Sequence, residues 1–109
     1  MLATDIKTVL ITVPNEEVAH TIARHLVEQR LAAGINIIPG LTSIYHWKGK
    51  IEEASELLLI AMTTESHLSE LEHEVKALHP YETPEVIVLP VTSGSQEYLS
   101  WVREETSDD

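Results

Sequence analysis

The pattern of apolar and polar residues predicts that the chain begins with a strand followed by an amphipathic helix. Residues 8–13 are rich in β-branched side chains and end at Pro14, which is typical of a buried strand. Asn15 is a candidate N-cap, and two glutamates follow it, where the helix dipole favours negative charge. Gly34 is expected to close this helix. The apolar positions of the helix form one stripe at helical spacing: Val18, Ala19, Ile22, Ala23 and Leu26.

The middle of the chain predicts a long antiparallel hairpin. Residues 35–38 start a strand, which Pro39-Gly40 interrupts at a bulge or an edge and which resumes over residues 41–47. Lys48-Gly49 predicts a tight reversal whose turn type the sequence leaves open. Residues 50–62 would then return as one long strand.

A second helix and a fourth strand are predicted after the hairpin. Thr64 can cap the helix, and His79 before Pro80 is expected to end it, because the residue before a proline disfavours helix. Residues 86–89 are consecutive apolar side chains bounded by prolines and predict a short strand. The apolar positions of the helix lie three or four apart: Leu68, Leu71, Val75 and Leu78.

A third helix is predicted near the end of the chain. Ser93 and Gln96 have the spacing of a capping box, and the segment after them carries Tyr98, Leu99, Trp101 and Val102. Residues 106–109 are expected to form a frayed tail. The sequence contains no internal repeat and no linker, so we expect a single domain over residues 1–109 with an ordered core of about residues 7–105.

The order of these elements indicates the class of fold. Strand, helix, strand, strand, helix and strand follow one another, with an added helix. This order predicts an α+β protein, a ferredoxin-like βαββαβ sandwich with an extra C-terminal helix and a long β-hairpin. Such folds support many unrelated functions, so the prediction concerns architecture only.

The length of the hairpin predicts self-association. A compact domain of this size is about 34 Å across, whereas a continuous strand over residues 50–62 would reach about 43 Å. One end of the hairpin would therefore overhang its own domain, carrying Tyr45 and Trp47, rings of the kind enriched at interfaces. The alternative is a strand broken near residues 53–55, with both rings packed on the local core.

The composition argues against nucleic-acid and membrane partners. The chain has 18 acidic and 7 basic residues and a formal net charge of −11, and its basic residues are scattered rather than clustered. The longest apolar run, residues 57–62, is far shorter than the roughly 20 residues that span a bilayer. An acidic surface attracts cations, which is compatible with metal binding but also serves solubility alone. The N-terminal segment does not resemble a signal peptide, so a cytoplasmic location is expected.

Neither an enzyme motif nor a thiolate metal site is present in the sequence. The chain has no cysteine, and it has no phosphate-binding glycine loop, serine elbow, zinc-protease helix or calcium loop. We therefore expect a protein that is not an enzyme and has no obligatory cofactor. The spacings of two histidine pairs, His20 with His25 and His67 with His73, do not allow chelation from one helix face, so these four are expected to be solvated.

His79 is the most suggestive histidine. It opens the segment His79-Pro80-Tyr81-Glu82-Thr83-Pro84, in which two prolines stiffen the chain and Tyr81 and Glu82 offer oxygen donors. A metal ligand and a cationic cap at the helix C-terminus are the two readings, and the sequence favours neither. His46, between Tyr45 and Trp47, is expected to be a strand residue that points away from the two rings.

Several separated segments resemble the signatures of the CutA family, the divalent-cation-tolerance proteins. They occur in the order typical of the family, and the resemblance extends over about residues 7–105. The segments are Arg30-Leu31-Ala32-Ala33, residues 39–51 from Pro39 to Ile51, residues 79–85 from His79 to Glu85, Pro90, and Glu97-Tyr98-Leu99-Ser100-Trp101.

The resemblance implies a ferredoxin-like subunit in a tight homotrimer, similar in architecture to the PII signalling trimers. It also implies a link to tolerance of divalent cations, copper above all, whereas animal relatives are associated with anchoring a membrane enzyme. Gly34 stands where family members often carry cysteine. Histidine and carboxylate remain as donors and suit Cu(II) better than Cu(I). The metal site that follows is His79 with Glu82, which a neighbouring subunit could complete.

Three functions are compatible with these observations. The first is a trimeric cytoplasmic protein linked to divalent metal tolerance or binding, with a divalent cation such as Cu(II) and its own copies as partners. The second is a PII-like regulator that binds a small metabolite or a protein partner. The third is a stable scaffold without a ligand.

Overall fold

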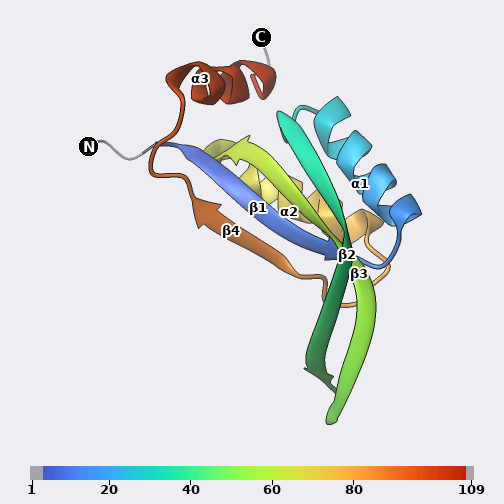
Figure 1. Ribbon diagram of the computed structural model, residues 1–109. Coiled ribbons are helices and arrows are strands. Elements are labelled where there is room, and N and C mark those ends of the chain that lie inside the picture. The colour runs from blue at the N-terminus through green and yellow to red at the C-terminus, as the bar shows by residue number, and fades with distance from the viewer. Residues whose placement is uncertain (1–3, 108–109) are drawn as a thin grey trace.

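The computed structural model describes residues 4–107, which form a four-stranded antiparallel sheet and three α-helices (Figure 1). The strands are β1 (Ile6–Val13), β2 (Gly34–Trp47), β3 (Lys50–Thr64) and β4 (Val86–Pro90), in the sheet order β2-β3-β1-β4. The helices are α1 (Glu16–Glu28), α2 (Leu68–Leu78) and α3 (Gln96–Glu105), with a 3-10 helix, η1 (Glu65–His67), before α2. The predicted ferredoxin-like α+β fold is thus confirmed, including the C-terminal helix and the long hairpin.

The start of α1 is as predicted, but its end is not. The Asn15 side chain accepts a hydrogen bond from the Val18 N–H at 2.9 Å, as an N-cap does. The helix ends at Glu28, and Arg30 takes the left-handed conformation with φ 57°. The next amide, of Leu31, then reaches back to the Leu26 carbonyl at 2.9 Å, which completes a Schellman motif. The prediction that Gly34 closes the helix is therefore wrong, because Gly34 already starts β2.

The main core lies between the sheet and the two helices α1 and α2, which cover one face of the sheet (Figure 1). The apolar stripe predicted for α1 is buried at Ala19, Ile22, Ala23 and Leu26. In α2, only Leu71 and Val75 of the predicted stripe are buried. The strand residues of this core lie at alternate positions, namely Val9, Ile11, Val13, Leu57, Leu59 and Ala61.

Helix α3 covers one end of the opposite sheet face. Leu99 and Val102 form a second buried cluster with Ile6, and the Trp101 ring lies against Gly34. The helix is capped by Ser95, whose hydroxyl accepts from the Tyr98 N–H at 3.3 Å. The predicted capping box of Ser93 and Gln96 is therefore wrong, because the helix starts two residues later.

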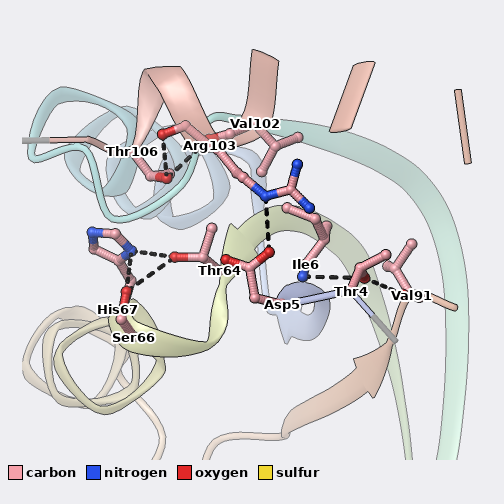
Figure 2. A network of polar contacts seen from close by, with 10 residues as sticks. All are labelled: Thr4, Asp5, Ile6, Thr64, Ser66, His67, Val91, Val102, Arg103 and Thr106. Carbon is pink, nitrogen blue, oxygen red and sulfur yellow. Dashed lines mark hydrogen bonds and ion pairs between the residues drawn. The ribbon is translucent and has the colours of Figure 1, made fainter. Parts of the chain in front are cut away.

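Polar contacts join α3 to Asp5, just before β1, and a separate set links Thr64, Ser66 and His67 ahead of α2 (Figure 2). Arg103 Nε donates to Asp5 Oδ1 at 2.9 Å, and the Thr106 hydroxyl donates to the Val102 carbonyl at the same distance. Thr106 is 1% exposed, so the prediction of a frayed tail is wrong at this residue, and Asp108 and Asp109 lie outside the described residues. Thr64 occupies the N-cap position of η1, the short helix before α2. Its hydroxyl bonds the His67 ring and not a backbone amide, so Thr64 makes no capping hydrogen bond.

The hairpin of β2 and β3 extends beyond the rest of the sheet, as the strand-length estimate predicts (Figure 1). The chain measures 44 × 29 × 23 Å, and β3 is continuous over 15 residues. A break near residues 53–55 is thus excluded. Lys48 and Gly49 have φ values of 49° and 81°, which identifies a type I′ turn. The Tyr45 and Trp47 rings remain 41% and 40% exposed in the single subunit.

In the described part of the chain, no helix lies over the middle of the second sheet face. The strand register places a set of apolar side chains on this open face, between α3 at one end and the overhanging hairpin at the other. Three of them are 42–45% exposed, at Ile38, Ile87 and Leu89. The others are Leu10, Leu58 and Ile60, which are only partly buried. Within residues 4–107, no helix combines the length and apolar character needed to cross a membrane.

Candidate functional site

A cavity of about 640 Å³ lies where the overhanging hairpin meets the segment that follows α2. Its volume is within the range of about 300–1,000 Å³ that is usual for small-molecule sites. The two segments that form it, residues 39–51 and 79–85, are those on which the family resemblance mainly depends. The lining residues are Thr12, Ser43, Ile44, Tyr45, Trp47, Glu56, Pro80, Tyr81, Glu82, Thr83 and Glu85.

A β-bulge brings the aromatic side chains of β2 to this cavity. Ile38 pairs with Leu58, but Leu41 pairs with Glu56, so β2 advances three residues while β3 advances two. Because side chains alternate between faces, one extra residue moves every later side chain of β2 to the other face. Tyr45 and Trp47 consequently share the open face of the sheet with Glu56. The predicted interruption at Pro39-Gly40 is confirmed as a bulge, and this shift of faces is its effect.

Buried hydrogen bonds of His79 position the segment that follows α2. The His79 side chain is 7% exposed, and its Nε2 lies 2.8 Å from the carbonyl oxygen of Thr12. A carbonyl can only accept, so Nε2 carries the proton, and Nδ1 accepts from the Tyr81 N–H at 3.1 Å. The two bonds define one neutral tautomer. His79 thus holds Tyr81 close to β1, with their ring centroids 4.8 Å apart.

A buried carboxylate is among the residues that line the cavity. Glu56 is 5% exposed, and its Oε2 accepts a hydrogen bond from the Tyr81 hydroxyl at 3.0 Å. Burial, and then the hydrogen bond and negative charge of Glu56, raise the pKa of Tyr81 to about 12, with a smaller contribution from Tyr45. Tyr81 therefore remains a neutral hydrogen-bond donor well above neutral pH.

An alkaline titration of the phenolate absorbance tests this contact. A free tyrosine ionises near pH 10, and we expect Tyr81 to ionise near pH 12. The Tyr81→Phe variant lacks this signal and so identifies it. Glu56→Gln should move the ionisation of Tyr81 towards the ordinary value, because it removes the neighbouring charge. The raised pKa stabilises the fold fully below about pH 10, and this contribution is lost as the pH rises towards 12. A Tyr81 that ionises near pH 10 in the unmodified protein would contradict the contact.

The predicted metal pair, His79 with Glu82, does not form a donor set in the structure. Glu82 lines the cavity, but neither ring nitrogen of His79 has a free lone pair, because one donates to Thr12 and the other accepts from Tyr81. In residues 4–107, no group of three His, Cys, Asp or Glu side chains is placed to hold a metal ion. His79 is the C-cap residue of α2 by position, and its side chain bonds Thr12 and Tyr81. The metal site stays a prediction without support from the geometry.

Other expectations about side chains are corrected by their contacts. His25 is not simply solvated, since its Nε2 lies 2.6 Å from Glu74 Oε1 and links α1 to α2. His67 bonds Thr64, whereas His73 is exposed as predicted. Glu56 is a site residue that the sequence reasoning missed. The available signal was the alternation in β3, which places the Glu56 carboxylate on the same strand face as Leu58 and Ile60.

Fold and cavity together define a small ferredoxin-like α+β protein with one open sheet face and a cavity under its long hairpin. The family model described as "CutA1 divalent ion tolerance protein" matches residues 7–105. A Thermus thermophilus protein named "Divalent-cation tolerance protein CutA" is 58% identical over 100 residues, which are 92% of this chain and 97% of that protein. The chain belongs to the CutA1 family.

Further relatives and solved structures agree with this assignment. The human "Protein CutA" is 52% identical over 101 residues, 93% of this chain, but the match spans only 56% of the human protein. A solved structure of a divalent cation tolerance protein, Cut A1 from Thermus thermophilus, has a TM-score of 0.92 and 57% identity, and the match covers 94% of this chain and 99% of that one. The names of relatives state different compartments, chloroplastic in Arabidopsis thaliana and periplasmic for Archaeoglobus fulgidus, so the cytoplasmic location stays a prediction.

Proposed function

We propose that this protein acts in the tolerance of divalent cations. The observation that carries the proposal is the family match over residues 7–105, together with the 58% identity to a Thermus thermophilus protein named for that role. Copper is the first cation to consider, because the donors available to a chain without cysteine are imidazole and carboxylate, which suit Cu(II). Relatives are named as tolerance proteins and not by a catalysed reaction.

Growth of a bacterium that lacks its own CutA protein tests the proposal. Expression of this chain is expected to restore growth in medium with raised Cu²⁺, and parallel cultures with Zn²⁺ and Ni²⁺ would define the range of cations. The control is the same vector with an early stop codon. Unrestored growth with every cation, at a verified level of folded protein, would contradict a role in cation tolerance.

We infer that the working unit is a homotrimer. The support is the open sheet face, which leaves apolar side chains from all four strands partly or largely exposed in one subunit, and the edge strands β2 and β4. Monomeric proteins seldom leave a contiguous apolar surface of this kind uncovered, and a closed ring of copies would cover both the face and the edges. Tyr45 and Trp47, on the overhanging hairpin, are the interface residues we propose.

Binding of a divalent cation by the assembled protein remains a proposal of its own. Within residues 4–107 of one subunit no three donor side chains converge, so a site with Cu(II) would need donors from more than one subunit. His79 and Glu82 could contribute to such a site only if the imidazole were released from Thr12 or Tyr81. Equilibrium dialysis of the assembled protein against Cu²⁺, with the number of ions bound per subunit as the result, measures it.

A second candidate function is that of a PII-like regulator which binds a small metabolite or a protein partner. The cavity under the hairpin is the observation that favours it. Aromatic rings and polar groups converge there, as they do in small-molecule sites. A scaffold without a ligand would leave this cavity unexplained.

A further inference from the structure

We propose that the cavity under the hairpin binds a small organic cation, an ammonium or guanidinium group on a compact organic frame, with Glu56 as its counter-ion. This inference rests on the second candidate function, the regulator, and names the chemical class of its ligand. It does not depend on a role in cation tolerance.

The first reason is the uncompensated charge of Glu56. The carboxylate is 5% exposed and accepts one hydrogen bond, from the Tyr81 hydroxyl. Among residues 4–107, neither a basic side chain nor a second hydrogen-bond donor contacts this carboxylate. A buried carboxylate is unfavourable unless it is paired with a cation. A ligand that carries positive charge into the cavity supplies this missing pair.

The second reason is the composition of the cavity wall. Of the described residues, those that line it include three carboxylates, at Glu56, Glu82 and Glu85, and no Lys or Arg. An anionic metabolite such as a nucleotide would find no basic partner there. The Tyr45 and Trp47 rings add electron-rich faces, which attract cations. Both are also the proposed interface residues, so in the assembly this cavity lies beside the subunit interface.

One contact of this kind already exists at the hairpin turn. The Lys48 ammonium lies 5.6 Å from the centroid of the Trp47 ring, although Lys48 does not line the cavity. The distance is within the range of about 6 Å for a cation–π interaction. The Trp47 ring thus already contacts one positive charge, which lies outside the cavity lining.

The size of the cavity separates an organic cation from a metal ion. A bound metal needs several donors within about 2.0–2.6 Å of one point, and residues 4–107 provide no such group. The cavity instead measures about 640 Å³, and three of its lining residues carry carboxylates. A ligand with several carbon atoms can contact the rings and carboxylates together, whereas a single ion cannot.

Titration calorimetry of the assembled protein with benzylammonium tests the proposal. Benzyl alcohol and benzoate have nearly the same shape and differ in charge, so they serve as matched probes. We expect saturable binding of benzylammonium at one site per subunit, binding of benzyl alcohol that is weaker by about tenfold or more, and no binding of benzoate. If benzylammonium does not saturate, or if benzoate binds as well, the proposal is wrong.

Variants of the cavity carboxylates test whether the charge of Glu56 is responsible for benzylammonium binding. Glu56→Gln keeps the shape and removes the charge, and should weaken benzylammonium binding by about tenfold or more. Glu70→Gln makes the same change on the exposed surface of α2 and should leave binding unaltered. If Glu56→Gln does not fold, the double variant Glu82→Gln, Glu85→Gln, at exposed positions, should still weaken binding several-fold. Equal affinities in the cavity variants and the control would indicate adventitious binding to an acidic surface and overturn the proposal.

A neighbouring subunit is the other source from which a cation could come. If a basic side chain of a second copy already filled the cavity, benzylammonium would not bind to the assembled protein, and the proposal of a small ligand would be overturned. The growth test with Cu²⁺ is independent of this result, because neither the probe nor Glu56 enters it. The two proposals can therefore fail separately.

Discussion

Leu10→Glu is expected to convert the assembled protein into separate subunits. Leu10 lies in the central strand β1, with Ile60 and Ile87 as its neighbours across the sheet, so it is at the middle of the open face. If three copies bury this face together, the substitution places a carboxylate from each copy inside the interface. Burial of an unpaired carboxylate costs on the order of several kcal/mol per ion. Native mass spectrometry and sedimentation should show loss of the trimer.

Thr21→Glu is the matched control for this substitution. Thr21 is exposed on α1, on the other side of the sheet from the open face, and the change adds the same negative charge. This variant should remain a trimer with nearly unchanged stability. If Leu10→Glu also remained a trimer at micromolar concentration, the open face would not be the interface, and the inferred assembly would be wrong.

His79→Ala is expected to destabilise the fold by about 2–4 kcal/mol, because it leaves a buried space and removes a partner from both the Thr12 carbonyl and the Tyr81 amide. The segment from residue 80 to residue 85 should become less protected against hydrogen exchange. Urea unfolding measures the loss of stability. Binding of Cu²⁺ should not change, because the imidazole has no free lone pair in the folded subunit.

His73→Ala provides the comparison, since His73 is an exposed histidine on α2. Its stability should change by less than about 0.5 kcal/mol. The opposite pattern, in which His79→Ala loses Cu²⁺ binding but keeps its stability, would restore His79 as a metal ligand. Equilibrium dialysis and unfolding on the same samples thus decide between the structural role and the metal role of this residue.

The metal site of His79 and Glu82 was predicted from residues that are close in the sequence, and the folded structure does not support it. The prolines around His79 suggest a stiff ligand loop, and the segment does form one wall of the cavity. The His79 ring, however, donates a hydrogen bond to the carbonyl of Thr12, a residue 67 positions away along the chain. Sequence spacing gives no information about such a partner, so the choice between ligand, cap and buried contact required the tertiary structure.

Elements whose signals are local could be predicted from the residue pattern alone. Alternating or helically spaced apolar residues, the Asn15 cap and the interruption at Pro39-Gly40 each depend on neighbours within a few positions, and the structure confirms them. The hairpin length also followed from the sequence, because an uninterrupted strand has a fixed rise per residue. The ferredoxin-like order of elements followed from these segments in turn.

Contacts between side chains that are distant in the sequence could be established only from the folded chain. Glu56 is a buried carboxylate that accepts a hydrogen bond from Tyr81, 25 positions later. The bulge moves Tyr45 and Trp47 to the same face as Glu56, an effect that depends on the register between two strands and not on either strand alone. The cavity exists because these contacts join segments that are far apart in the chain, and residue patterns report only what lies close along it.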